Sequence, residues 1–259
     1  MSENDYFYRY RSLAGEGLEW VRCSILYSQH HFAAPLSFND PFDCRPHVVM
    51  RGSDDQFIKF YEGSLARRYP EMSSEDRRIE AGRLLSDPES GPRIPANFSK
   101  FTEMYYGTVP ASASVLCMSE VRDDLLMWAH YADSHKGVCL ALTRSNPFFA
   151  TAHPVNYQDL RPEVNWLTDS REIVLDRTMF TKSDHWRHEK EWRILRYEHR
   201  HGPSPYTLPS EVLAGIVLGS QISEEHRIKI TEWAAGSHSK PWIHKAALSP
   251  TEFKLVITP

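Results

Sequence analysis

Near residue 190, three charged side chains stand at every second position. They are Glu189, Glu191 and Arg193, and the neighbouring Trp192 and Ile194 favour a strand here. Alternate residues of a strand point to one face, so the pattern predicts that the three charges share a face. A carboxylate oriented by an arginine can stabilise a developing cation or polarise a hydroxyl. An exposed face with a cross-strand salt bridge is an equally open interpretation.

A second charged pair lies in the first strand expected from the sequence. Aromatic and basic residues alternate along Tyr6–Arg11, so Arg9 and Arg11 should share a face. Two neighbouring guanidiniums suit a phosphate or a carboxylate, because each donates two parallel hydrogen bonds. Pairing with a structural acid, Asp40 or Asp43, is the alternative.

Metal and thiol chemistry have weaker support. His185 and His188 could share a helical face near Asp184, but this spacing is not a ligand signature, and we expect no metal. Cys117 and Cys139 fall in apolar strand segments, where burial suppresses thiolate chemistry. Both are predicted to be structural and not disulfide-bonded.

The elements that must position these residues are visible as patterns. Ser119 is a plausible N-cap of the helix whose buried face carries Leu125, Trp128 and Tyr131. Strands and helices are mixed without a regular βαβ alternation, which favours an α+β fold. Strands are expected near residues 6–11, 28–32, 114–118, 138–142, 189–195, 214–218, 242–246 and 253–257, and helices near 17–24, 170–180 and 223–236.

Charge density rises between residues 53 and 107, where apolar residues recur at helical spacing between prolines. We predict a helical insertion of two or three helices there, packed on the rim of one mixed sheet. The whole chain, 1–259, is then expected to be a single domain.

Overall charge disfavours two classes of partner, although a local basic cleft is compatible with it. The chain of 259 residues has 30 Lys and Arg against 34 Asp and Glu, a net charge of -4. A general nucleic-acid coat or an anionic-membrane binder would carry a basic excess. The apolar run Leu125–Ala129 is far shorter than the roughly 20 residues of a membrane-spanning helix, and the polar start does not resemble a secretory signal. We therefore expect a cytoplasmic protein with no membrane partner.

The order of the motifs resembles a bacterial family known as Domain of Unknown Function 2971. Each motif is short, but the combination is specific and spans about residues 6 to 195. The family name implies kinship and no activity. The matching segments are residues 8–13, 38–43, 117–120, 126–132 and 137–139, then Lys182 and residues 186–193.

The layout is also similar to that of ADP-ribosyltransferases, with an early aromatic-basic strand, a short helix, an Asn-containing loop and a late strand that carries Glu. This resemblance implies a mainly antiparallel mixed sheet, NAD as substrate and no metal. Tyr131 or Trp128 could stack on nicotinamide, although their spacing favours core packing. The implied catalytic residues are Glu191 and Glu189, and the implied nucleotide contacts are Arg9, Tyr10, Arg11, Asn39, Asp40, Ser119, Tyr131 and Arg193.

In such an enzyme, one carboxylate stabilises the oxocarbenium character of the breaking ribose–nicotinamide bond and a second deprotonates the nucleophile. The acceptor, protein or nucleic acid, is left open, and water would make the chain an NAD glycohydrolase. We expect Glu191→Gln to slow the reaction about 100–1000-fold with little change in stability. The alternatives are a metal-dependent nuclease that uses His185, His188 and Glu189, and a non-catalytic sensor.

The segment Ser37–Asp43 should be an ordered loop. Asn39 and Asp40 can accept hydrogen bonds from nearby backbone amides, and Pro41 stiffens the turn. A purely structural turn is one interpretation. The functional one is that this loop walls the ligand site beside Arg9.

Overall fold

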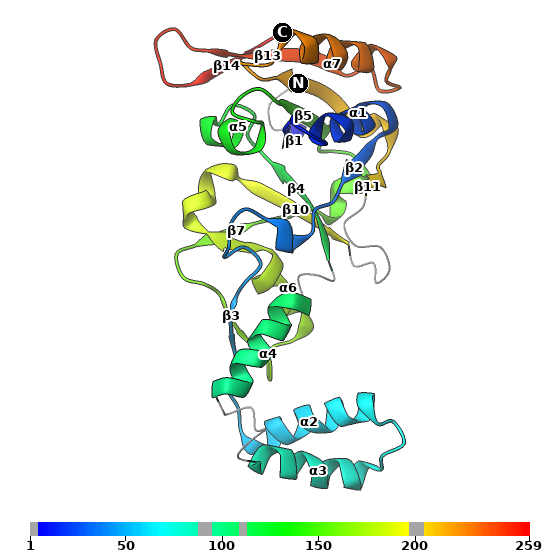
Figure 1. Cartoon of the computed structure of the whole chain (residues 1–259), viewed down its shortest axis with the longest axis vertical. Helices are drawn as coiled ribbons and strands as arrows, with labels where there is room; N and C mark the ends of the chain where they lie inside the picture. The colour runs from blue at the N-terminus through cyan, green and yellow to red at the C-terminus, as the bar shows by residue number, and fades with distance from the viewer. Residues whose placement is uncertain (1–4, 88–94, 109–112, 197–204) are drawn as a thin grey trace. The chain divides into compact units, whose positions relative to one another are not determined.

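The computed structural model describes residues 5–87, 95–108, 113–196 and 205–259. It divides into two compact units, which Figure 1 shows together. The first unit consists of Met1–Phe38, Ala113–Tyr157 and Asp184–Pro259, and the second of Asn39–Ser112 and Gln158–Ser183.

The first unit is built on an eight-stranded sheet in the order β14-β13-β12-β5-β1-β4-β10-β6. Only β12 and β13 pair in parallel, so the fold is α+β with a mixed, mainly antiparallel sheet, as predicted. The strands are β1 (Tyr6–Arg11), β4 (Ser114–Ser119), β5 (Val138–Thr143), β6 (His153–Pro154), β10 (Glu191–Arg196), β12 (Leu213–Leu218), β13 (Trp242–Leu248) and β14 (Leu255–Thr258).

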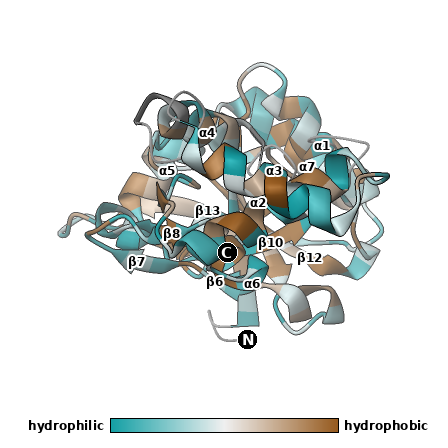
Figure 2. Cartoon of the chain, turned by 90° about the horizontal axis from the view of Figure 1, so that it is seen from below, coloured by the Kyte–Doolittle hydropathy of each residue, from teal (hydrophilic) through white to brown (hydrophobic). Residues whose placement is uncertain are grey.

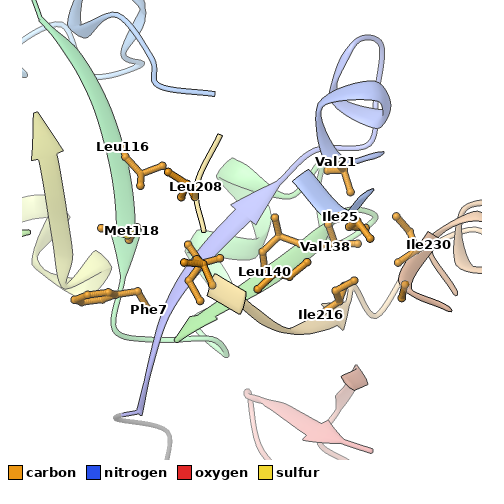
Figure 3. Close-up of a cluster of buried hydrophobic side chains, with 14 of the residues drawn as sticks. Phe7, Val21, Ile25, Leu116, Met118, Val138, Leu140, Leu208, Ile216 and Ile230 are labelled. Atoms are coloured by element: carbon orange, nitrogen blue, oxygen red, sulfur yellow. The ribbon is translucent and has the colours of Figure 1, made fainter. Parts of the chain in front are cut away.

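One face of this sheet is covered by two helices, α1 (Gly17–Tyr27) and α7 (Glu224–Gly236). Ser223 caps α7 by accepting a hydrogen bond from the amide of His226, as its sequence position predicts. Figure 3 shows the apolar cluster of this face, in which Val21, Ile25 and Ile230 of the helices meet strand residues such as Phe7, Leu116, Leu140 and Ile216. Burial of this cluster fixes which residues of β1 and β4 point to the helices.

The opposite face packs against α5 (Leu125–Tyr131). Tyr6, Tyr8 and Tyr10 of β1 contribute to a cluster with Met127 and Trp128 of that helix. The tyrosines of β1 therefore face α5, and the residues between them face α1 and α7, as the alternation predicts. Trp128 is fully buried, which confirms core packing for this residue.

A short antiparallel pair, β2 (Gln29–His31) with β11 (Pro205–Thr207), belongs to the same unit. Short 3-10 helices connect the strands: η2 (Pro35–Ser37), η4 (Pro147–Thr151), η5 (Asp184–Glu189) and η6 (Ser210–Val212). An isolated bridge joins Ala33 to Val115, so the segment after β2 lies beside β4.

The second unit contains the helices expected between residues 53 and 107. Two of them precede the undescribed residues 88–94, and the third follows these residues. Figure 2 shows hydrophilic and hydrophobic residues mixed along them. Its elements are β3 (His47–Val49), which pairs in parallel with β8 (Glu163–Asn165), together with α2 (Asp54–Arg68), α3 (Ser74–Ser86), α4 (Pro95–Thr108), α6 (Arg171–Met179) and β9 (Thr181–Ser183). β7 (Asn156–Gln158) spans the point where the chain enters this unit.

The predicted insertion is thus part of a larger unit that also takes in residues 39–52 and 158–183. Contacts such as the 2.6 Å hydrogen bond between the hydroxyls of Tyr105 and Thr178 hold α4 to α6. The pattern between 53 and 107 did not predict these distant partners. A single domain over 1–259 stays a prediction. Within the described ranges, no helix has the length and apolar character needed to cross a membrane.

The four cysteines, all in the described part of the chain, form no disulfide. Cys139 is fully buried in β5, and burial raises the pKa of its thiol well above the ordinary value. We expect Cys139 of the native protein to resist a thiol-alkylating reagent and to be modified quickly in urea, as peptide mass spectrometry would show. The half-buried Cys23 is the internal comparison. Equal labelling rates for Cys139 in native and denatured protein would contradict its burial.

Candidate functional site

The acidic segment before β10 differs from its prediction in one respect. Glu189 ends the 3-10 helix η5, and the strand begins only at Glu191. Between them, Lys190 has a φ of 43°, in the left-handed region. Strict period two therefore does not extend to Glu189, and the prediction of one continuous strand face for all three charges was wrong at this residue.

Glu191 and Arg193 form a buried bidentate ion pair. Arg193 donates from Nε to Oε1 at 2.8 Å and from Nη2 to Oε2 at 2.9 Å. Only 6% of Glu191 and none of Arg193 is exposed. The ring of Phe38 lies 5.2 Å from the guanidinium carbon of Arg193 and completes its enclosure. The pair is thus fixed in orientation.

Glu189 is held by α5 and β4. The hydroxyl of Tyr131 donates to its Oε1 at 2.7 Å, and the hydroxyl of Ser119 donates to its backbone carbonyl at 2.6 Å. Ser119 does not cap α5, contrary to the prediction. Asp124 does so, because its Oδ1 accepts from the amides of Leu126 and Met127 at 2.9 Å. We call Glu189, Glu191, Arg193, Tyr131 and Ser119 the Glu191 cluster.

The strand register decides which predicted site residues share a face. Tyr8 lies opposite Ser119, and Ser119 lies opposite Glu191, so the three form a row across β1, β4 and β10. Directly opposed residues point to the same face. The carboxylate of Glu191 therefore starts on the face of the tyrosines, including Tyr10, whose hydroxyl donates to the carbonyl of Val121 at 2.9 Å.

Arg9 starts on the other face, because it lies opposite Leu140 of the Figure 3 cluster. Its Nη2 donates to the carbonyl of His31, and Nη2 of Arg11 donates to the same carbonyl at 3.3 Å. Only 5% of Arg9 is exposed, and its Nη1 has no hydrogen-bond partner. In the portion of the chain that the structure describes, no carboxylate pairs with Arg9 or Arg11.

Arg9 and Arg11 lie in the part of β1 that is no longer paired with β4. Tyr8 is the last residue of β1 in register with β4, and farther along β4 the bridge to Ala33 takes its place. The carbonyl of His31, which accepts from both arginines, lies two residues before Ala33. We call Arg9, Arg11, His30 and His31 the Arg9 cluster. The spacing of the two histidines in the sequence did not indicate a site. They lie beside Arg9 and Arg11 because the chain returns through β2.

Burial disfavours the charged forms of the side chains in the Arg9 cluster. Burial, and then the charge of Arg11, lower the pKa of Arg9 well below its ordinary value. Burial also lowers the pKa of Arg11 to about 10. Burial and these two arginines lower the pKa of His30 strongly and that of His31 to about 4. The histidines are therefore neutral at pH 7, and an anion bound at the arginines would relieve the repulsion.

Acidification should destabilise the fold through His30. Its folded pKa lies below the unfolded value near 6.5, so the stabilisation is present above pH 6.5 and is lost as the pH falls. The loss is at most about 1.4 kcal/mol per pH unit, or about 2 kcal/mol at pH 5. Urea denaturation of wild type and His30→Leu at pH 7 and pH 5 measures it. The variant should lose less on acidification, and the exposed His238→Leu should match wild type. A wild-type slope in His30→Leu would refute the assignment.

The predicted loop residues Asn39 and Asp40 belong to the second unit, so their place in a site with Arg9 stays a prediction. Oδ1 of Asp40 accepts from the amide of Phe42 at 2.8 Å, as expected for a fixed turn. Asp43 pairs with Lys182, whose Nζ lies 3.6 Å from its Oδ2, and both side chains are buried. The described residues hold no group of three or more His, Cys, Asp or Glu side chains placed to bind a metal ion.

Comparison with known proteins gives one match. Residues 127–194, which run from α5 to β10 and include Glu189, Glu191, Arg193 and Tyr131, match the family described as protein of unknown function (DUF2971). No curated protein and no solved structure matches the chain. The resemblance expected from the motifs is confirmed for this segment. Over residues 127–194, the chain is similar to the DUF2971 family of proteins of unknown function.

Proposed function

We propose that the chain binds NAD through the Arg9 cluster and breaks its ribose–nicotinamide bond with the help of Glu191. It would act as an ADP-ribosyltransferase-like enzyme, or as an NAD glycohydrolase where water is the acceptor. The observation that carries the proposal is the buried guanidinium of Arg9, with a free Nη1 and a second guanidinium beside it. A pyrophosphate supplies the negative charge and the paired oxygens that such donors require.

The Glu191 cluster contains the acids that the reaction needs. As the bond from ribose C1′ to the nicotinamide nitrogen breaks, its electron pair leaves with nicotinamide and positive charge develops on the ribose. Glu191, oriented by Arg193, would stabilise that charge. Glu189 would take the proton of the water or acceptor hydroxyl as its oxygen bonds to C1′.

The two clusters are close along the sheet. Neighbouring strands are about 4.8 Å apart, so the row from Tyr8 through Ser119 to Glu191 spans roughly 10 Å. Arg9 follows Tyr8 directly. A dinucleotide can cover this span.

A second candidate is a non-catalytic module that binds a nucleotide at the Arg9 cluster. The specific observation in its favour is that Arg9 and Glu191 start on opposite faces of the sheet. Under this alternative, the ion pair of Glu191 with Arg193 holds β10 in place, and the bound nucleotide is released unchanged.

The test is incubation of the full chain with NAD, followed by mass spectrometry of nicotinamide, ADP-ribose and ADP-ribosylated protein or nucleic acid. We expect product from wild type and about 100–1000-fold less from Glu189→Gln. Arg9→Met should lose NAD binding, and Arg22→Met, at a half-buried arginine of α1 outside both clusters, is its control.

The other outcomes reject the proposal in distinct ways. NAD that binds through Arg9 but stays intact supports the sensor. NAD that neither binds nor reacts excludes both candidates. Cleavage of nucleic acid that a chelator abolishes would favour the nuclease interpretation with His185, His188 and Glu189.

A further inference from the structure

The second unit contains a cavity of about 280 Å³ that the proposed NAD site does not use. Its volume is close to the lower limit of small-molecule sites, about 300 Å³. Four cationic side chains, Arg45, Arg161, Arg177 and Lys182, line it against one acidic side chain, Asp159. An excess of positive charge around a small hollow favours an anionic occupant.

Arg161 is held rigidly by neutral acceptors. Its Nε and Nη2 donate to the carbonyl of Arg45 at 3.0 and 2.8 Å. Nη2 also approaches the carbonyl of Pro46 at 3.0 Å and the hydroxyl of Tyr106 at 2.8 Å. Among the residues with described positions, no carboxylate pairs with Arg161. These contacts fix the guanidinium in place and leave its charge uncompensated.

Arg45 brings a second charge that no carboxylate of the described residues pairs with. Its guanidinium carbon lies 5.7 Å from the centre of the Tyr106 ring, and Tyr106 thus contacts both arginines. In contrast, Arg177 pairs with Asp169 at 2.9 Å, and Lys182 lies 3.6 Å from Asp43. The excess charge of the cavity is therefore concentrated on Arg45 and Arg161. Two guanidiniums beside one ring can share the oxygens of a single phosphate.

Apolar surface lies next to these arginines. Phe42 is 60% exposed and Leu160 is 81% exposed, and both line the cavity. The guanidinium of Arg161 already lies over the Phe42 ring at 5.7 Å. A flat ring placed against Phe42 would gain contact area and displace water from both apolar residues.

We propose that this cavity binds a small phosphorylated molecule with a planar ring, of the nucleoside monophosphate class. The phosphate contacts Arg45 and Arg161, and the ring packs against Phe42. The site shares no residue with the Arg9 cluster or the Glu191 cluster, so it does not depend on the proposed NAD chemistry.

Isothermal titration of the full chain with adenosine 5′-monophosphate, inorganic phosphate and adenosine tests the proposal. We expect the monophosphate to bind at one site in the Arg9→Met variant, phosphate to bind more weakly and adenosine not measurably. Arg45→Gln should weaken the monophosphate about 10-fold to 100-fold. Arg45 is exposed, so this variant should fold. Arg78→Gln, an exposed arginine of the same unit outside the cavity, should bind like wild type.

Three results would overturn the proposal. One is the absence of monophosphate binding. Another is binding that Arg45→Gln leaves unchanged or that Arg9→Met abolishes, because the ligand would then lie elsewhere. The third is a single-stranded oligonucleotide that binds through Arg45 while the mononucleotide does not, which would assign the surface to nucleic acid. Phe42→Ala should weaken the monophosphate but not inorganic phosphate, and equal weakening of both would exclude the role of the ring.

Discussion

Glu191→Gln is expected to lower the free energy of unfolding by about 3–5 kcal/mol. The carboxylate forms both hydrogen bonds of a buried bidentate pair, and its loss leaves the guanidinium of Arg193 buried without its charge partner. This result corrects the expectation from the sequence, in which Glu191 lines an open cleft and its replacement changes stability little. The same substitution is therefore unsuitable as a test of catalysis when used alone.

Urea denaturation of three variants measures the effect. The double variant Glu191→Gln/Arg193→Met removes both charges and should recover most of the lost stability, because an apolar side chain can replace a buried ion well. Glu224→Gln breaks an exposed pair with Arg227 and should cost less than about 1 kcal/mol. A Glu191→Gln protein as stable as wild type would show that the pair contributes nothing to folding. The folded double variant also tests whether NAD turnover needs the charge of Glu191.

Arg9→Met should have the opposite effect on stability to Glu191→Gln and raise the free energy of unfolding by about 1–3 kcal/mol. Arg9 is buried, its Nη1 lacks a partner, and Arg11 repels it. Replacing an unsatisfied buried polar group by an apolar one of similar length removes a desolvation cost of about that size. A residue that lowers stability in this way is typical of a binding site.

Thermal unfolding with and without pyrophosphate measures both halves of this prediction. Wild type should be stabilised by the anion, and Arg9→Met should start more stable but gain less from the anion than wild type does. Arg22→Met, at a half-buried position of α1 outside the Arg9 cluster, should retain the wild-type response. A less stable Arg9→Met protein would indicate that Arg9 has a structural role in the first unit.

Much of the first unit could be predicted from the sequence because its signals are local. The alternation in Tyr6–Arg11 reflects a strand with a tyrosine face and an arginine face. Apolar runs gave β4, β5 and β12, and Ser223 with Gly236 gave the limits of α7. Each of these patterns follows from burial or capping within a few residues.

The candidate site was harder to predict, because its geometry depends on distant contacts. No local pattern shows that Lys190 adopts a left-handed conformation and takes Glu189 out of the strand. Asp124, rather than Ser119, caps α5, although both residue types suit that role. The meeting of His30 and His31 with Arg9 requires the segment after β2 to lie beside β4, which only the assembled sheet determines.

The central place of β1 has a consequence for synthesis on the ribosome. This strand is made before its neighbours β4 and β5, which begin only at Ser114 and Val138. Until then, an aromatic strand emerges with both edges open, and such a strand can pair with another chain and aggregate. Arg9 and Arg11 interrupt its apolar character, and such charges would oppose aggregation during this interval. The two arginine charges that lower the stability of the folded protein would thus protect the nascent chain from aggregation.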